Sequence, residues 1–296
     1  MMLGLTVVMY HYVRDADDAS PGILGIPGLP VAAFHAQLDA LARTYEMVTW
    51  ADVRAAVLGE RELPERACLL TFDDGTSDHY RNVFPALRAR GMSGVFFHIA
   101  RNRAGLPMPH KLHYLLPRMG AAELREAVRG RLNAAERERF DAAEARYRTI
   151  CKSETDALKT TLQREFETIV DPWLSEWIEA QIGPEVELAN KLFLQAEQVR
   201  EMRAGGMHFG GHSQTHPWFD YIDPARRARE IRASAEWLGG IEHAPYAFAY
   251  PYGGLTDDAP PLLRQAGFAA AFTTRSQVEH ADPFYIGRLD GEEVNG

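Results

Sequence analysis

Residues 67–75 read Ala-Cys-Leu-Leu-Thr-Phe-Asp-Asp-Gly, an apolar run that ends in two adjacent carboxylates. The run predicts a strand at 67–72, so Asp73 and Asp74 would follow the carboxyl end of that strand. Short apolar runs alternate with helical patterns on both sides of it, with Gly and Pro between them. This rhythm predicts βα units that build a parallel sheet or barrel.

The remaining elements are predicted from the same patterns. Further strands are expected at 3–10, 94–99, 207–211, 246–249 and 268–273. Helices are expected at about 31–44, about 80–91, about 224–239 and about 256–266. In barrels of this kind the chemistry gathers at the carboxyl ends of the strands. The residues that follow predicted strands at such ends are Asp73, Asp74, His212 and Tyr252.

Residues 101–200 break the rhythm, because they are rich in Arg, Glu, Ala and Leu and carry almost no strand signal. The stretches 121–132 and 135–148 are typical of amphipathic helices. Since the strand–helix rhythm resumes afterwards, we interpret 101–200 as a helical insertion within a single domain that spans 1–296. The insertion either covers one face or forms homo-oligomer contacts, or it is a lid that recognises substrate.

The composition is that of an ordinary globular protein, with 46% hydrophobic residues and a net charge of −9 from 32 basic and 41 acidic residues. The acidic excess argues against a nucleic-acid partner. Cys68 and Cys151 give no disulfide framework, and Cys68 is expected to be a buried, inert thiol. Residues 1–12 lack a basic region and a cleavage signal, and no run is long enough to span a membrane. We therefore expect no transmembrane segment and a cytoplasmic location, although a chain trimmed of a leader would look the same.

One Asp and two His form a common ligand set for a catalytic divalent metal. His212 and His216 lie four positions apart, so they would share a face if the chain turned helically after its strand. One carboxylate of the Asp73–Asp74 pair would complete the ligand set, and its neighbour would accept a proton from the bound water. We expect Zn²⁺, with Co²⁺, Ni²⁺ or Mn²⁺ as alternatives.

Three motifs occur in order along the chain, each after a predicted strand. They are Thr-Phe-Asp-Asp-Gly at 71–75, Gly-Gly-His-Ser-Gln-Thr-His at 210–216 and Ala-Tyr-Pro-Tyr-Gly-Gly at 249–254. In these motifs the sequence resembles the polysaccharide deacetylase family, which is the NodB-homology domain of carbohydrate esterase family four. The resemblance covers about 1–100 and 195–290.

The resemblance implies an α/β fold, a distorted (β/α) barrel of about seven strands. It also implies roles for individual residues. Asp73 would be the general base, and the metal would be held by Asp74, His212 and His216. Pro251 would form part of a groove wall, and the backbone N–H of Tyr252 would help to bind the oxyanion.

Two departures from the family pattern point to substitutes. The third motif usually carries an Arg that orients the base, and here that position is Ala249. We expect Arg288, in Ile-Gly-Arg-Leu-Asp at 286–290, to take its place. The late strand also lacks the His that usually serves as general acid. Some family members are circularly permuted, and His11 after the first strand fits such a variant.

Two groups of side chains allow two interpretations each. His110, Lys111 and His113 begin the insertion, and they either contact an anionic substrate or form a solvated polar face. Trp218 and Tyr221 follow the His pair, and they either stack on a sugar ring or pack the loop.

The sequence therefore predicts a metal-dependent hydrolase that removes an N-acyl group, most simply acetyl, from an amino sugar or a glycan precursor. A cytoplasmic location would favour a nucleotide-linked or lipid-linked sugar. Two alternatives are a hydrolase of another C–N amide, of the formamide or ureide type, and a non-catalytic sugar-binding protein.

Overall fold

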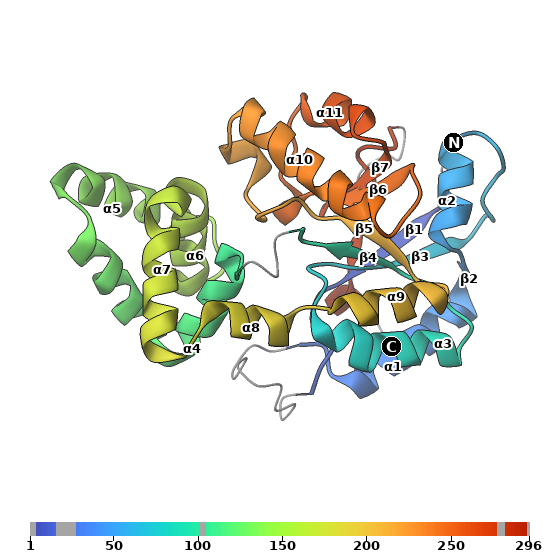
Figure 1. The fold of residues 1–296 in the computed structure, drawn as a ribbon, viewed down its shortest axis with the longest axis horizontal. Helices are drawn as coiled ribbons and strands as arrows, with labels where there is room; N and C mark the ends of the chain where they lie inside the picture. Colours follow the sequence, from blue (N-terminus) through green and yellow to red (C-terminus); the bar gives the residue numbers. More distant parts are fainter. Residues whose placement is uncertain (1–3, 16–27, 101–104, 277–281, 295–296) are drawn as a thin grey trace.

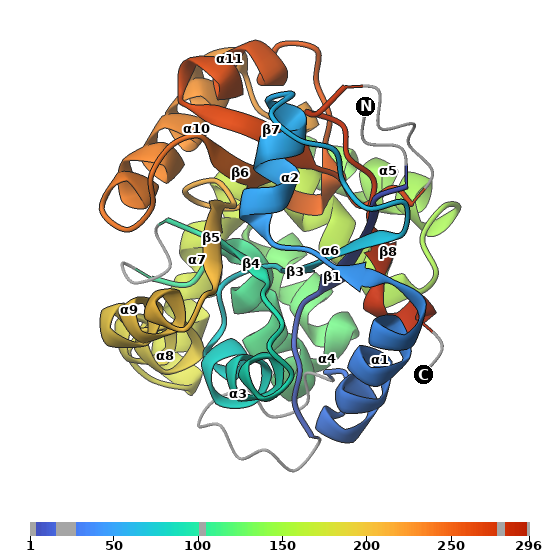
Figure 2. The ribbon, with the colours of Figure 1, turned by 90° about the vertical axis from the view of Figure 1, so that its right-hand side faces the viewer.

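A curled parallel sheet forms the centre of the computed structural model, which describes residues 4–15, 28–100, 105–276 and 282–294. The sheet follows chain order for most of its width, in the sequence β7-β6-β5-β4-β3-β1-β8, with β2 beside β3. The strands are β1 Thr6–Tyr10, β2 Glu46–Met47, β3 Ala67–Phe72, β4 Val95–His98, β5 His208–Gly211, β6 Tyr246–Ala249, β7 Phe268–Phe272 and β8 Leu289–Asp290. The predicted distorted (β/α) barrel is thus confirmed (Figures 1 and 2).

The two ends of the curled sheet are connected by the segment 286–290. Ile286 pairs with Phe272 at the end of β7. A few residues later β8 pairs with β1, with Leu289 opposite Val8. One short piece of chain therefore touches both edges of the sheet, and Arg288 lies between its two pairings.

Alternate residues of each strand face the inside and the outside of the curled sheet. Val7, Leu69 and Phe97 belong to an inner hydrophobic cluster. Their neighbours Val8 and Leu70 belong to an outer cluster, which also contains the apolar faces of the covering helices. Those helices are α1 Val31–Thr44, α3 Phe84–Ala89, α9 Ala196–Ala204, α10 Pro224–Gly239 and α11 Ala259–Gln265.

The predicted strands and helices agree with the structure to within a few residues. The helix at 31–44 and the strands at 67–72 and 246–249 have the expected bounds. The helix expected at 80–91 is a π-helical turn, His79–Val83, followed by α3. The sequence patterns missed β2, β8 and the helix α2, Trp50–Val57.

A lobe of helices projects from the barrel between β4 and β5 (Figure 1). Its helices are α4 Met108–Arg131, α5 Ala134–Arg148, α6 Glu154–Glu165, α7 Glu167–Gln181 and α8 Glu185–Leu192. The lobe has a hydrophobic core of its own, which includes Leu112, Leu162 and Leu174. α9 instead packs Val199 and Met202 into the outer cluster of the barrel. Residues 101–104, which begin the predicted insertion, lie outside the described residues.

Two simpler expectations concern cysteines and membranes. Cys68 is buried in β3, and burial raises the pKa of its thiol to about 12, so it is an inert core residue. Among the described residues, no helix has the length and apolar character that crossing a membrane requires.

Candidate active site

The site forms at the carboxyl ends of the strands. The first residue after β1, β3 and β5 keeps the in–out alternation of its strand, so its side chain points to the inside of the barrel. Asp73 follows Leu69 and Thr71 at every second position, and His11 follows Val7 and Met9 in the same way. His212 follows β5 with the same alternation. Three side chains from distant parts of the sequence therefore point toward the same end of the barrel.

A tight turn separates the roles of the two neighbouring aspartates. Asp74 and Gly75 both have left-handed backbone angles, with φ of 73° and 70°. Such a conformation strains Asp74, and a side chain at position 75 would place its Cβ 2.2 Å from the ring of His98. The turn directs the Asp73 and Asp74 carboxylates to different partners.

Asp73 forms a buried two-pronged ion pair with Arg288. Nη1 and Nη2 of Arg288 each donate to one carboxylate oxygen over 2.7 Å, and the two side chains are 2% exposed or less. Arg288 also donates to the carbonyl oxygen of Thr273 and to the hydroxyl of Thr71. Burial alone would raise the pKa of Asp73, but Arg288 outweighs burial and holds that pKa below 3.8. Asp73 is therefore ionised at neutral pH and held in one orientation.

His11 lies beside the same carboxylate. Its Nε2 is 3.9 Å from Asp73 Oδ2, and nearly half of its side chain (46%) is exposed. Its backbone carbonyl is 2.7 Å from Nε2 of the fully buried His79. His79 thus fixes the loop that carries His11, a contact that the sequence analysis missed.

His212 and His216 converge without a helical turn. The chain after β5 is an irregular loop in which Ser213 and His216 both have φ of 61°. Glu230 of α10 holds this loop by accepting hydrogen bonds from the backbone N–H groups of Gln214 and Thr215 and from the Thr215 hydroxyl. The loop is specified by a distant glutamate, and the spacing of the motif alone could not reveal it.

Asp74, His212 and His216 form a compact set of donors. Asp74 Oδ1 lies 3.6 Å from His212 Nε2 and 3.5 Å from His216 Nε2, and the two ring nitrogens are 3.1 Å apart. These atoms are close enough to share one ion. His212 Nδ1 is 2.8 Å from the carbonyl oxygen of Ala249, which leaves its Nε2 free to face the set.

The electrostatics of the set fit a cation. Burial lowers the pKa of His212, and burial together with the His212 ring lowers that of His216 to about 3. Both rings are therefore neutral near pH 7, as metal ligands must be. Burial would raise the pKa of Asp74, but His110 and His216 outweigh it and hold that pKa well below 3.8. Asp74 Oδ1 is buried without a hydrogen bond from any described residue.

A cavity of about 330 Å³ opens above these residues. His11, Asp73 and His216 line its floor, and Trp218 and Tyr252 stack on each other at 4.3 Å along its wall. Pro251 is buried and is not part of this lining, so the predicted turn contributes its wall through Tyr252. Side chains of α6 complete the lining, namely Asp156, Lys159, Thr160 and Gln163.

The polar residues at the start of the insertion are not a solvated face. His110 is 1% exposed and Lys111 is 4% exposed. Lys111 is paired with Asp171, while the Nε2 of His110 faces Asp74. The place of His110 beside Asp74 is marked by no motif in the sequence.

The chain matches the sequence model of the polysaccharide deacetylase family over residues 60–127 and 154–271, which is more than half of its length. A poly-β-1,6-N-acetyl-D-glucosamine N-deacetylase of Escherichia coli is 49% identical over 87 residues. The Bacillus subtilis protein YxkH is 26% identical over 110 residues. These matches span 29% and 37% of this chain, but only 12% and 35% of the two relatives.

Solved structures share the fold over nearly the whole chain. A Streptococcus pyogenes deacetylase, PplD, superposes with a TM-score of 0.60 at 16% identity, covering 98% of this chain and 93% of the other. IcaB from Ammonifex degensii gives a TM-score of 0.57 at 22% identity, covering 97% and 91%. The family match includes the segments 71–75, 210–216 and 249–254, and it establishes that the chain belongs to the polysaccharide deacetylase family.

Proposed function

We propose that this protein is a metal-dependent hydrolase that removes the acetyl group from an N-acetylated amino sugar of a glycan or glycan precursor. The observation that carries the proposal is the donor set of Asp74, His212 and His216 with the ionised Asp73 beside it. A purely binding protein has no need for a free carboxylate next to three metal ligands. The poly-N-acetylglucosamine deacetylase among the relatives supports an acetylated amino sugar as substrate.

Asp74, His212 and His216 would hold the ion, with Zn²⁺ as the first candidate and Co²⁺, Ni²⁺ or Mn²⁺ as alternatives. A divalent ion bound there would lower the pKa of a water ligand and polarise the acyl carbonyl. Asp73 accepts the proton of the attacking water, and Arg288 keeps that carboxylate ionised and oriented before the transfer.

His11 then donates a proton to the nitrogen of the breaking C–N bond, which leaves as the free amine while acetate is released. Its position at the cavity floor, half exposed and beside Asp73, suits this role. The backbone N–H of Tyr252, at the cavity wall, would donate to the oxyanion. Trp218 lies between the Tyr252 ring and the Arg164 guanidinium, so it would meet a sugar with its edge and not with a free face.

The test is a pair of variants assayed with metal analysis. Asp73→Asn keeps the shape of the base but cannot accept the proton, so it should lose nearly all acetate release while metal stays bound. His216→Ala should lose the metal itself. The substrates would be N-acetylglucosamine oligomers, with small formamides and ureides as a comparison panel. Near-normal turnover by Asp73→Asn would contradict the mechanism, and preference for the panel would favour the other amide hydrolases.

We also propose that 1–296 form one deacetylase domain in which 101–200 is an insertion. A cytoplasmic location and an oligomer formed through the insertion stay predictions. Cell fractionation tests the first, and light scattering of the purified protein tests the second.

A further inference from the structure

One side chain of the helical lobe, His110, lies directly beside Asp74. This residue lies in the first turn of α4, and its ring packs against Phe193 at 4.9 Å between centroids. The ring is 1% exposed. Neither of its nitrogens forms a hydrogen bond with any residue that the structure describes. A buried imidazole left in this state is unfavourable, so a partner for it is expected.

The nearest polar group is the Asp74 carboxylate. His110 Nε2 lies 3.5 Å from Asp74 Oδ2, whereas His212 and His216 face the other oxygen, Oδ1. One oxygen of Asp74 is thus directed at the donor set and the other at the lobe. A shift of roughly 0.6 Å would bring the His110 contact to the length of a charge-assisted hydrogen bond.

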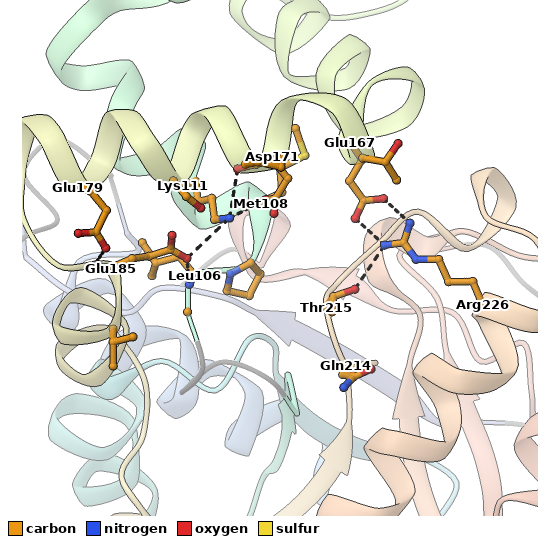
Figure 3. A pocket seen from close by; sticks show the side chains of 16 residues that line it. Leu106, Met108, Lys111, Glu167, Asp171, Glu179, Glu185, Gln214, Thr215 and Arg226 are labelled. Carbon is orange, nitrogen blue, oxygen red and sulfur yellow. Dashed lines mark hydrogen bonds and ion pairs between the residues drawn. The ribbon is translucent and has the colours of Figure 1, made fainter.

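Lys111, the next residue, fixes the first turn of α4 in the lobe (Figure 3). Its ammonium group contacts Asp171 of α7 at 2.8 Å and Glu185 of α8 at 3.7 Å. Glu185 also accepts a 2.6 Å hydrogen bond from the backbone N–H of Leu106. The start of α4 is therefore tied to two other helices, and the direction of the His110 ring depends on the folded lobe.

We propose that His110 is a positioning residue of the metal centre, whose Nε2–H donates to Asp74 Oδ2 and holds the carboxylate with Oδ1 toward the ion. The inference rests on the proposed metal-dependent function. Carboxylate ligands in metal sites are commonly held by such an outer hydrogen bond, and its loss typically weakens metal binding about 10–100-fold. The lobe then does more than cover the barrel, because it completes the geometry of the site.

The experiment measures Zn²⁺ affinity by competition with a chromogenic chelator, in full-length variants. His110→Leu fills the space without a donor and should bind Zn²⁺ about 10–100-fold more weakly than the wild type. His110→Gln restores an N–H donor and should recover part of the affinity. His110→Met, a more adaptable apolar side chain, serves where His110→Leu does not fold. Substitution with Co²⁺ adds a second readout, because its visible spectrum reports the ligand arrangement.

Leu112→Ala is the matched control. Leu112 is fully buried in the same helix and belongs to the core of the lobe, so its truncation should lower the melting temperature without changing Zn²⁺ affinity. Wild-type affinity in His110→Leu or His110→Met would overturn the positioning role alone. An equal loss in Leu112→Ala would also overturn it, because any damage to the lobe would then suffice. A wild-type protein that binds no divalent ion would overturn the proposed function as well.

Discussion

Arg288 controls the charge state of Asp73 through direct contact. Because burial alone would raise the pKa of Asp73, the guanidinium is the main group that offsets burial and lowers that pKa. We expect Arg288→Met to raise the pKa of Asp73 and so to move the acid limb of the pH profile of kcat/KM to higher pH. The unpaired buried carboxylate should also cost about 3–5 kcal/mol of stability at neutral pH.

The control for this prediction is the double variant Arg288→Met with Asp73→Asn, which removes the buried charge together with its partner. Its loss of stability should be clearly smaller than the sum of the two single losses. Additive losses, or an unshifted acid limb in Arg288→Met, would show that the pair does not act as a unit.

At the level of single residues, sequence reasoning located the groups that carry recognisable motifs. Arg288 and His11 were placed by asking what could replace a missing family residue, and the structure brings both to Asp73. Their catalytic roles stay predictions. Glu230 and His79 were missed, because each acts through hydrogen bonds to residues of another segment and no local pattern marks such contacts.

The loop at 212–216 carries two of the three residues that could hold a metal ion. Two backbone N–H groups and one hydroxyl of the loop donate to Glu230, where a helix would instead have formed backbone hydrogen bonds. We expect Glu230→Ala to leave two partly buried N–H groups without their partner, to cost about 1 kcal/mol of stability, and to weaken Zn²⁺ binding. Thermal unfolding with and without Zn²⁺ measures both effects.

The matched variant is Glu236→Ala on the same helix, where the side chain is exposed to solvent. It should leave Zn²⁺ binding unchanged. If Glu230→Ala bound Zn²⁺ as tightly as Glu236→Ala, the loop would be rigid for reasons other than Glu230.

Elements with a strong local pattern were predictable, and short or irregular ones were not. The apolar run of β3 and the helical spacing of α1 gave their bounds directly. β2 and β8 have only two residues each, which is too short for a period to be visible. The form of the His loop was not predictable, because spacing at i and i+4 cannot distinguish a helix from a tight irregular loop that brings the same side chains together.

Over the whole molecule, several buried histidines make stability depend on pH. Burial lowers the pKa values of His79, His212 and His216 below 6.5. The unfolded chain therefore binds more protons than the folded one as the pH falls below about 6.5, so stability declines in that direction. Asp73 and Asp74, whose pKa values lie below 3.8, extend the decline to more acidic pH.

We therefore expect the melting temperature of the metal-free protein to fall steadily between about pH 6.5 and pH 4. Differential scanning calorimetry in the presence of a chelator measures this dependence. His79→Phe removes one buried imidazole and should flatten the profile. A melting temperature that stays constant from pH 7 to pH 4 would contradict the assignment of neutral, buried histidines.

The segment 286–290 also determines when, during synthesis, the site can be completed. Arg288 follows Asp73 by 215 positions. During synthesis, Asp73 therefore leaves the ribosome long before the arginine that orients its carboxylate. Until that late segment arrives, the edges of β7 and β1 also lack the chain that touches both. Under the proposed function, completion of the barrel and orientation of Asp73 by Arg288 are therefore one event, and a nascent chain halted before residue 286 should lack deacetylase activity.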